Sequence, residues 1–226
     1  MSFKFKFFYF LLFTFYFSLS TFFGRVEVID RIVAVVNNQV ITLTELKIAR
    51  AFRLYPASKS QQIMPASFYL EKLIEQKLVT QVTGQKVTIE ESEIEGYLEK
   101  IRNNLGSELF EAKLQEFGLK RDDLKKYIYQ KVLGDRIISQ KLFQNVAVSL
   151  EEIENYYQQI YLPVQKEKGL KPQPLIEMVN KIEAAIIENR RKRQVEDWIA
   201  NLKRQADIQI EVKDIDEYFR TQERKS

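Results

Sequence analysis

The sequence contains neither cysteine nor histidine in 226 residues. Without cysteine the chain can form no disulfide bond and no thiolate nucleophile. Without histidine it lacks the commonest general base and metal ligand, which excludes the usual zinc sites and a Ser-His-Asp triad. We therefore expect no catalytic residue and no metal site of these kinds.

Glycine is also scarce, and its seven positions are at least ten residues apart. A phosphate-binding loop needs closely spaced glycines, so neither a dinucleotide-binding fingerprint nor a P-loop can form. We expect no bound nucleotide, no work driven by ATP and no cofactor. The glycines are Gly24, Gly84, Gly96, Gly106, Gly118, Gly134 and Gly169.

The charge balance gives little support for a nucleic-acid partner, because the formal net charge is only +4. The densest basic run, Arg190–Arg193, lies in a predicted helix with acidic neighbours and without interleaved aromatic residues. A solvated helix face explains this run most simply, with anionic lipid or an acidic client segment as alternatives. Apolar residues make up 45% of the chain, a proportion typical of globular proteins.

The first segment has the layout of a secretory signal peptide. Lys4 and Lys6 precede residues 7–23, which carry no charge. We expect a signal peptide at residues 1–20 with cleavage after Ser20, or an uncleaved anchor extending to about residue 24. In both cases the rest of the chain works outside the cytoplasm, in the periplasm, and an uncleaved segment 7–23 would attach it to the inner membrane.

The stretch from Asp30 to Glu45 predicts a β-hairpin followed directly by a helix. Ile32–Val36 and Val40–Ile41 are apolar, and Asn37-Asn38 between them tolerates the positive φ of a tight turn. Thr42 and Glu45 have the spacing of a capping box. A β-hairpin of this size is not stable alone in water, so another segment must complete it.

Apolar residues at helical spacing predict a largely helical chain beyond this point. Capping boxes are predicted at Thr88–Glu91 and Ser149–Glu152, and Pro163–Pro174 is predicted to be a linker or exposed loop. The inward side chains of the last long helix are expected to be Val179, Ile182, Ile186, Val195, Ile199 and Leu202. The predicted helices cover residues 44–54, 65–82, 88–105, 107–117, 119–143, 149–160 and 175–204.

Residues 208–212 alternate between apolar and polar side chains, which predicts a half-buried strand. This strand has no neighbour in the sequence, so we expect it to pair with the β-hairpin at residues 32–41. The two ends of the chain would then close on each other. The fold class predicted is mainly α with a small β-sheet, and residues 214–226 form a charged tail without an assigned role.

Several large side chains fall at helix ends or outside the clean core stripes. They form either peripheral core or an apolar crevice for an extended peptide, because aromatic residues and methionine give large contact areas without requiring one sequence. The candidate client-binding residues are Phe52, Tyr55, Met64, Phe68, Tyr69, Tyr156, Tyr157 and Tyr161.

The segment Asp30–Asn37, together with Val40–Thr42 and Glu45-Leu46, closely resembles the opening of the SurA-type periplasmic chaperones. Gly118–Leu142 resembles a later helix of that family's amino-terminal domain, and Val148–Tyr157 resembles the junction where its parvulin prolyl-isomerase domain begins. Pro174–Val212 resembles the family's carboxy-terminal helix and strand.

The resemblance implies a SurA/trigger-factor-like helical chaperone core over residues 26–213. That core would consist of an amino-terminal part, 26–161, and a carboxy-terminal part, 174–213. Residues 162–173 would then be a linker that replaces the isomerase domain. Parvulin sites rely on histidines, which this chain lacks, so we expect no isomerase activity and no enzyme.

The function predicted is that of an ATP-independent holdase outside the cytoplasm. Its partners would be unfolded polypeptides, with outer-membrane proteins in transit suggested by the resemblance. The main alternative is a structural or assembly subunit that binds one specific partner, and a degenerate prolyl isomerase is a third. The sequence leaves homodimerisation open.

Overall fold

A β-hairpin begins the part of the chain that the structure describes. The computed structural model describes residues 30–55, 64–82, 87–142 and 147–223. Strand β1, Ile32–Val36, pairs antiparallel with strand β2, Gln39–Thr42. Between them, Asn37 has a φ of 52°, a left-handed conformation that asparagine adopts more readily than most residues. The predicted β-hairpin is confirmed.

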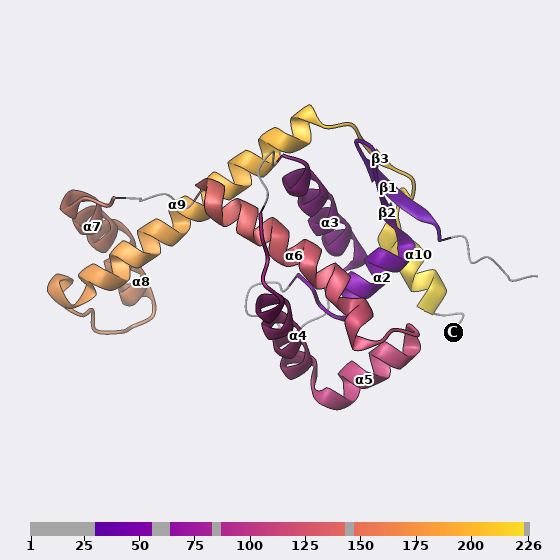
Figure 1. The fold of residues 1–226 in the computed structure, drawn as a ribbon. Helices are drawn as coiled ribbons and strands as arrows, with labels where there is room; N and C mark the ends of the chain where they lie inside the picture. The colour runs from indigo at the N-terminus through magenta and orange to yellow at the C-terminus, as the bar shows by residue number, and fades with distance from the viewer. Residues whose placement is uncertain (1–29, 56–63, 83–86, 143–146, 224–226) are drawn as a thin grey trace, which may run out of the picture. The chain divides into compact units, whose positions relative to one another are not determined.

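The third strand comes from the far end of the sequence. Strand β3, Ile208–Ile210, lies antiparallel to β1 on the side away from β2, giving the order β2-β1-β3 (Figure 1). Asn37 Oδ1 accepts a hydrogen bond from the Asp207 N–H at 3.0 Å, and the Asn37 N–H donates to the Asp207 carbonyl at 2.7 Å. The predicted pairing of the first and last strands is confirmed, although β3 ends at Ile210.

The helices after β2 follow the predicted boundaries to within a few residues. Thr42 caps the first of them, accepting a hydrogen bond from the Glu45 N–H at 3.2 Å. They are α2, Leu43–Ala51; α3, Ala66–Gln81; α4, Glu91–Leu105; α5, Ser107–Glu116; and α6, Arg121–Leu142.

The start of α4 corrects one prediction. The capping box predicted at Thr88–Glu91 is wrong, because the cap is Glu90, two residues after Thr88. The Glu90 N–H donates to Glu93 Oε1 at 3.3 Å, and the Glu90 side chain accepts from the backbone of Glu93. Glutamate is not a favoured cap whereas threonine is, so the sequence pattern favours the nearby Thr88. The box predicted at Ser149 and Glu152 is confirmed.

The main core lies where the sheet meets helices α2–α6. Phe52 and Phe110 are completely buried, and their rings make an edge contact with centroids 5.8 Å apart. Other buried side chains include Val33, Val36, Ile41, Leu46, Leu73, Leu98, Leu124 and Ile128. Side chains distant in sequence thus share one interior, as the predicted closure of the chain ends requires.

The segment predicted to be a linker begins inside a helix. Helix α7, Leu150–Tyr156, continues through a π-helical segment, Tyr157–Tyr161, into α8, Leu162–Glu167. Pro163 lacks an N–H and would crowd the carbonyl four residues earlier, and a wider π turn just before it relieves that conflict. Helix therefore persists to Glu167, and the prediction of a loop is wrong for residues 163–167. The return to the next helix occupies only residues 168–174.

Helix α9, Leu175–Gln205, buries different faces in its two halves. Met178 and Ile182 pack with Ile153 of α7, whereas Ile199 packs with Val79 of α3 and Ile137 of α6. Val195 follows Ile186 by nine residues, and at about 100° per residue this turns the apolar stripe to the opposite side of the helix. The predicted single inward face is therefore divided between two clusters.

We call the unit formed around the Ile153, Met178 and Ile182 cluster the helical hairpin. It consists of α7, the π-helical segment, α8 and residues 175–186 of α9. At one end Arg190 donates to the Ala147 carbonyl at 2.8 Å and pairs with Glu152. At the other end the Tyr157 hydroxyl donates to the Gln173 carbonyl at 2.7 Å. Helix α7 therefore runs antiparallel to α9.

The charged tail forms a helix that packs onto the core. In α10, Ile215–Glu223, Ile215 and Phe219 are buried. The Arg31 and Arg50 guanidinium groups lie over the rings of Tyr218 and Phe219, respectively, at 5.0 and 5.3 Å from their centroids. The high charge density of residues 214–226 concealed this apolar face from sequence analysis.

The predicted signal segment lies outside the described residues. Within the described ranges, none of the helices is both long enough and apolar enough to cross a bilayer.

Candidate functional site

A cleft opens where α3, α6 and α9 meet. Its deeper part, which we call the inner pocket, has a volume of about 320 Å³, within the usual range for pockets that bind small ligands or side chains. The residues that line it are Tyr55, Phe68, Lys72, Glu75, Gln76, Val79, Lys131, Gly134, Asp135, Ile138, Val195 and Ile199.

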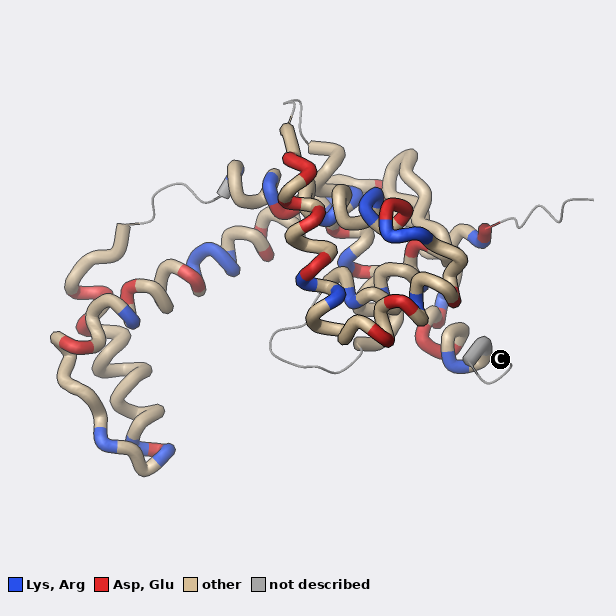
Figure 2. The backbone as a smooth tube through the Cα atoms, turned by 60° about the horizontal axis from the view of Figure 1, so that its bottom comes forward, with Lys and Arg blue, Asp and Glu red and all other residues tan. Residues whose placement is uncertain are grey.

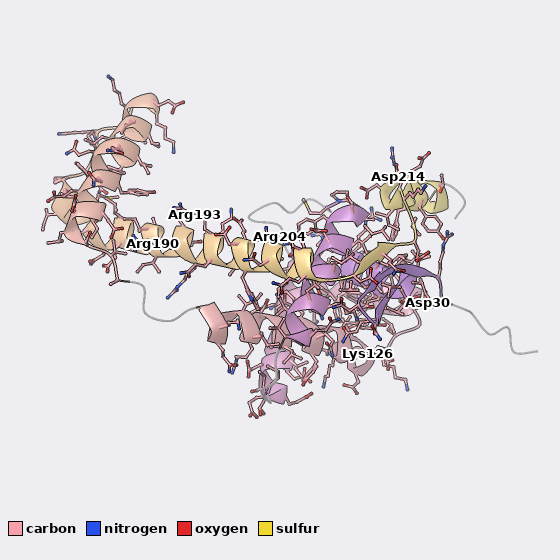
Figure 3. All side chains as sticks on the ribbon, turned by 90° about the horizontal axis from the view of Figure 1, so that it is seen from above. Asp30, Lys126, Arg190, Arg193, Arg204 and Asp214 are labelled. Atoms are coloured by element: carbon pink, nitrogen blue, oxygen red, sulfur yellow. The ribbon has the colours of Figure 1, made fainter. Side chains whose placement is uncertain are left out.

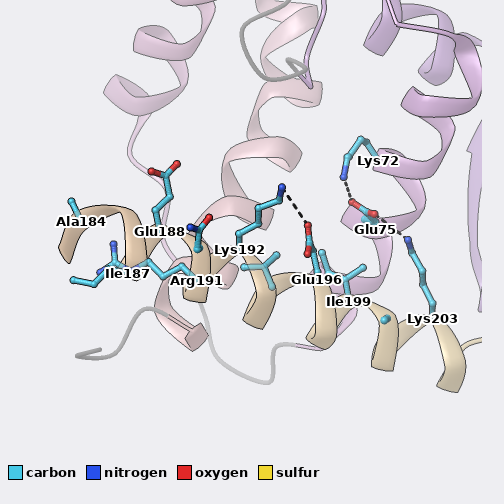
Figure 4. Close-up of a pocket in the computed structure, with 13 residues that line it drawn as sticks. Lys72, Glu75, Ala184, Ile187, Glu188, Arg191, Lys192, Glu196, Ile199 and Lys203 are labelled. Carbon is cyan, nitrogen blue, oxygen red and sulfur yellow. Dashed lines mark hydrogen bonds and ion pairs between the residues drawn. The ribbon is translucent and has the colours of Figure 1, made fainter. Parts of the chain in front are cut away.

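A shallower outer groove continues from this pocket along α9 (Figure 4). It has a volume of about 1200 Å³ and shares Lys72, Glu75, Val195 and Ile199 with the inner pocket. On α9 it extends from Ala184 to Lys203, a rise of about 28 Å along the helix axis. Together the inner pocket and the outer groove form what we call the cleft.

The floor of the cleft is apolar. Val79 and Ile199 are buried beneath it, and Ile138 and Val195 are partly exposed at its surface. Gly134 lies within the continuous helix α6 and lines the inner pocket, where a β-carbon in its place would lie 3.7 Å from Cγ of Gln76. A glycine inside a helix costs about 0.5–1 kcal/mol relative to alanine, so a glycine within an otherwise helical pattern was a usable signal of this pocket.

Charged side chains line the rim in opposite-sign pairs. Glu75 accepts hydrogen bonds from Lys72 at 2.6 Å and from Lys203 at 3.0 Å, and Lys203 also pairs with Glu71. Burial alone would lower the pKa of the Lys203 ammonium, but the hydrogen bonds to Glu71 and Glu75 outweigh it and raise that pKa. Lys192 and Glu196 are paired at 3.8 Å further along α9 (Figure 4).

A polar network lies at the deep end of the inner pocket. The Tyr55 hydroxyl donates to Gln76 Oε1, and the Lys131 ammonium lies 5.7 Å from the ring centroids of both Tyr55 and Tyr97. Burial raises the pKa of the Tyr55 phenol, and it raises the pKa of Tyr97 to about 12. Both phenols therefore stay neutral across the physiological range and act as hydrogen-bonding groups.

The basic run Arg190–Arg193 lies on α9 between its two packed halves, and Figure 2 shows it as a blue band. Figure 3 shows Arg190 and Arg193 on α9, with Arg190 close to the helical hairpin. Arg190 is occupied by Ala147 and Glu152, while Arg191 and Lys192 line the outer groove. The run therefore contributes both to the attachment of the hairpin and to the rim of the cleft.

The structure separates the eight predicted client-binding residues into two groups. Met64 and Phe68 are partly buried against the main core, and Phe68 lines the inner pocket together with Tyr55. Phe52, Tyr55 and Tyr69 are core residues with at most 7% of their surface exposed. Among these five, Phe68 offers the most accessible contact with the cleft.

The second group belongs to the helical hairpin. Tyr156, Tyr157 and Tyr161 are partly exposed and pack against its small core of Ile153, Met178 and Ile182. The rings of Tyr157 and Tyr161 are stacked with centroids 5.3 Å apart. The groove-lining residues of α9 were not among the predicted site residues, because their apolar members appeared to be ordinary core positions.

The chemistry available in the cleft is that of binding. An apolar floor accepts apolar side chains, and the rim offers hydrogen-bonding and charged groups of both signs. Among the described residues there is no cluster of three or more acidic side chains placed to hold a metal ion. The cleft can therefore hold an extended apolar segment without demanding one sequence.

No protein-family model matches the chain, but curated proteins do. It is 28% identical over 145 residues to "Chaperone SurA" of Ralstonia nicotianae, which covers 60% of this chain and 29% of that protein. It is 26% identical over 142 residues to "Chaperone SurA" of Pseudomonas putida, covering 59% and 33%. It is also 26% identical over 138 residues to that of Legionella pneumophila, covering 58% and 32%. The matched stretch spans about a third of the length of these relatives. Over some three fifths of its length, the chain is therefore similar in sequence to proteins named Chaperone SurA.

Proposed function

We propose that the protein is an ATP-independent holdase that binds segments of unfolded polypeptides in the cleft between α3, α6 and α9. The observation that carries this proposal is the cleft itself, with its apolar floor and its rim of both charge signs. The similarity to proteins named Chaperone SurA supports the same function. The proposal extends to a periplasmic location and to outer-membrane proteins as clients.

The binding free energy that this function requires is modest, because the client must be released without nucleotide hydrolysis. A dissociation constant of about 1 μM corresponds to a binding free energy of about −8 kcal/mol. At about 25 cal/mol per Å², this requires a net apolar burial of roughly 300 Å², and more in gross terms because ordering the client costs free energy. A segment of about eight extended residues matches the length of the groove wall on α9.

We also propose that the chain has no isomerase activity. It contains no histidine, and the position of the expected isomerase domain is occupied by α8 and the short return to α9. The curated relatives are named as chaperones.

An aggregation assay tests the holdase function. The protein should suppress the aggregation of a chemically unfolded client in the absence of nucleotide. Ile187→Asp should weaken this suppression several-fold, because Ile187 lines the outer groove and belongs to neither cluster that fixes α9. Light scattering of the client measures the effect.

The matched control is Leu109→Asp, which changes a side chain of α5 that is 44% exposed and lies outside the cleft. It should suppress aggregation like the unmodified protein. Equal client aggregation with and without the protein would overturn the holdase proposal. Suppression limited to a single client would favour an assembly subunit with one specific partner.

A further inference from the structure

The helical hairpin leaves several large apolar side chains exposed to solvent. The three most exposed large apolar side chains among the described residues all belong to it or to its loop. They are Ile176, Leu150 and Leu170, with 82%, 72% and 55% of their surface exposed, respectively. Ile160 in the π-helical segment adds a fourth at 47%. A two-helix unit this small cannot bury all its apolar residues by itself.

These side chains lie near opposite ends of the hairpin. Leu150 begins α7, at the end where Arg190 holds Glu152. Ile176 is near the start of α9, at the end where Gln173 contacts Tyr157 and Tyr161. An antiparallel second hairpin would therefore bring Ile176 of each copy toward Leu150 of the other. Such reciprocity is what a two-fold symmetric interface requires.

The charges of the hairpin have the same reciprocal arrangement. Glu151 and Glu154 are exposed on α7 beside Leu150, whereas Glu152 is already paired with Arg190. Lys166, Lys168 and Lys171 are exposed at the opposite end, around the loop between α8 and α9, where they outnumber the exposed Glu167 and Glu177 (Figure 2). Arg191 and Lys192 line the outer groove on another face of α9. An antiparallel arrangement places the lysines of one copy beside the glutamates of the other.

We infer that the helical hairpin is a homodimerisation surface, on which two copies pack antiparallel as a four-helix bundle. Two helical hairpins that each leave an apolar face uncovered commonly bury those faces in this way. None of the side chains proposed to form this surface lines the cleft, although helix α9 belongs to both. The inference is thus independent of the proposed function.

A charge exchange between two variants tests this arrangement. One variant carries Lys166→Glu, Lys168→Glu and Lys171→Glu, and the other carries Glu151→Lys and Glu154→Lys. Analytical ultracentrifugation of the exported protein at low salt should show a dimer for the unmodified chain. Each variant alone should be monomeric, because like charges then meet at both ends. An equimolar mixture should recover the dimer, because the introduced glutamates of one copy then face the introduced lysines of the other, and the native Glu151 and Glu154 face the native lysines.

An apolar substitution provides a second, independent readout. Ile176→Asp should abolish the dimer, whereas Ile210→Asp should leave it intact, since Ile210 is similarly apolar and 53% exposed but lies on β3. Circular dichroism checks that every variant keeps the helix content of the unmodified chain.

Three results would overturn the inference. An unmodified chain that is monomeric at all concentrations rules out the interface. A dimer that persists in both charge variants places the interface elsewhere. A monomer that floats with anionic vesicles, and loses this binding on substitution of the three lysines, assigns the surface to a membrane instead.

Discussion

At the residue scale, Asp216 shows how one side chain joins helix α10 to the start of helix α3. Helix α3 begins after Pro65, which offers no side-chain cap, and its first turn contains no acidic residue. Asp216 of α10 supplies the missing group, since its Oδ1 accepts a hydrogen bond from the Ser67 N–H at 2.9 Å. Burial alone raises the pKa of this carboxyl, but hydrogen bonds from Ser67 and Ala66 outweigh it and lower the pKa.

We predict that Asp216→Ala lowers the free energy of unfolding by about 1 kcal/mol, as expected for the loss of a helix cap. Chemical denaturation near neutral pH measures this change. Glu217→Ala, at the exposed neighbouring position, is the control and should have a much smaller effect.

The pH dependence of Asp216 follows from its lowered pKa. A carboxyl whose pKa is lower in the folded state stabilises the fold above its unfolded-state pKa, and this contribution is lost as the pH falls through the folded-state pKa. The stability difference between the unmodified protein and Asp216→Ala should therefore shrink as the pH falls below about 4. A difference that stays constant on acidification would contradict a role for the ionised carboxylate.

This contact also marks a limit of prediction at the residue scale. Ser67 and Asp216 are 149 residues apart in sequence, and no local sequence pattern around either residue indicates that they are in contact. The Thr42 and Ser149 caps were predictable because each cap and its partner are three residues apart. A long-range contact such as that between Ser67 and Asp216 can be identified only once the fold is known.

At the scale of elements, α9 shows where a correct helix prediction still missed the packing. Its apolar residues have helical spacing, but between Ile186 and Val195 the apolar stripe turns to the opposite side of the helix. A helix whose two halves bury opposite faces can hold the helical hairpin on one side and contribute to the cleft on the other. Arg190 lies at the junction, where it bonds both to Ala147 and to Glu152.

We predict that Arg190→Met loosens the helical hairpin without unfolding the main core. Hydrogen exchange should become faster in α7 and α8 while the amides of α3 and α6 stay protected, because the substitution removes contacts of the hairpin alone. Arg193→Met, an exposed change on the same helix, should leave both patterns unaltered. Faster exchange throughout the chain would show instead that Arg190 supports the whole fold.

At the scale of the whole molecule, the closure of the chain ends was predictable and the cleft was not. Residues 208–212 alternate in a way that demands a sheet partner, and the β-hairpin at residues 32–41 was the remaining candidate. The cleft, by contrast, depends on how three helices diverge, which hydrophobic periodicity does not encode. Of the predicted aromatic residues, Tyr55 and Phe68 line it.

The proposed function requires that a client binds in the cleft between α3, α6 and α9. Photo-crosslinking from unnatural residues at Ile138 and Ile187, with Leu109 as the control position, tests it most directly. We expect nucleotide-independent crosslinks to an unfolded client from the inner pocket and the outer groove, and few from α5. Crosslinks of equal yield at all three positions, or none at Ile138 and Ile187, would contradict it.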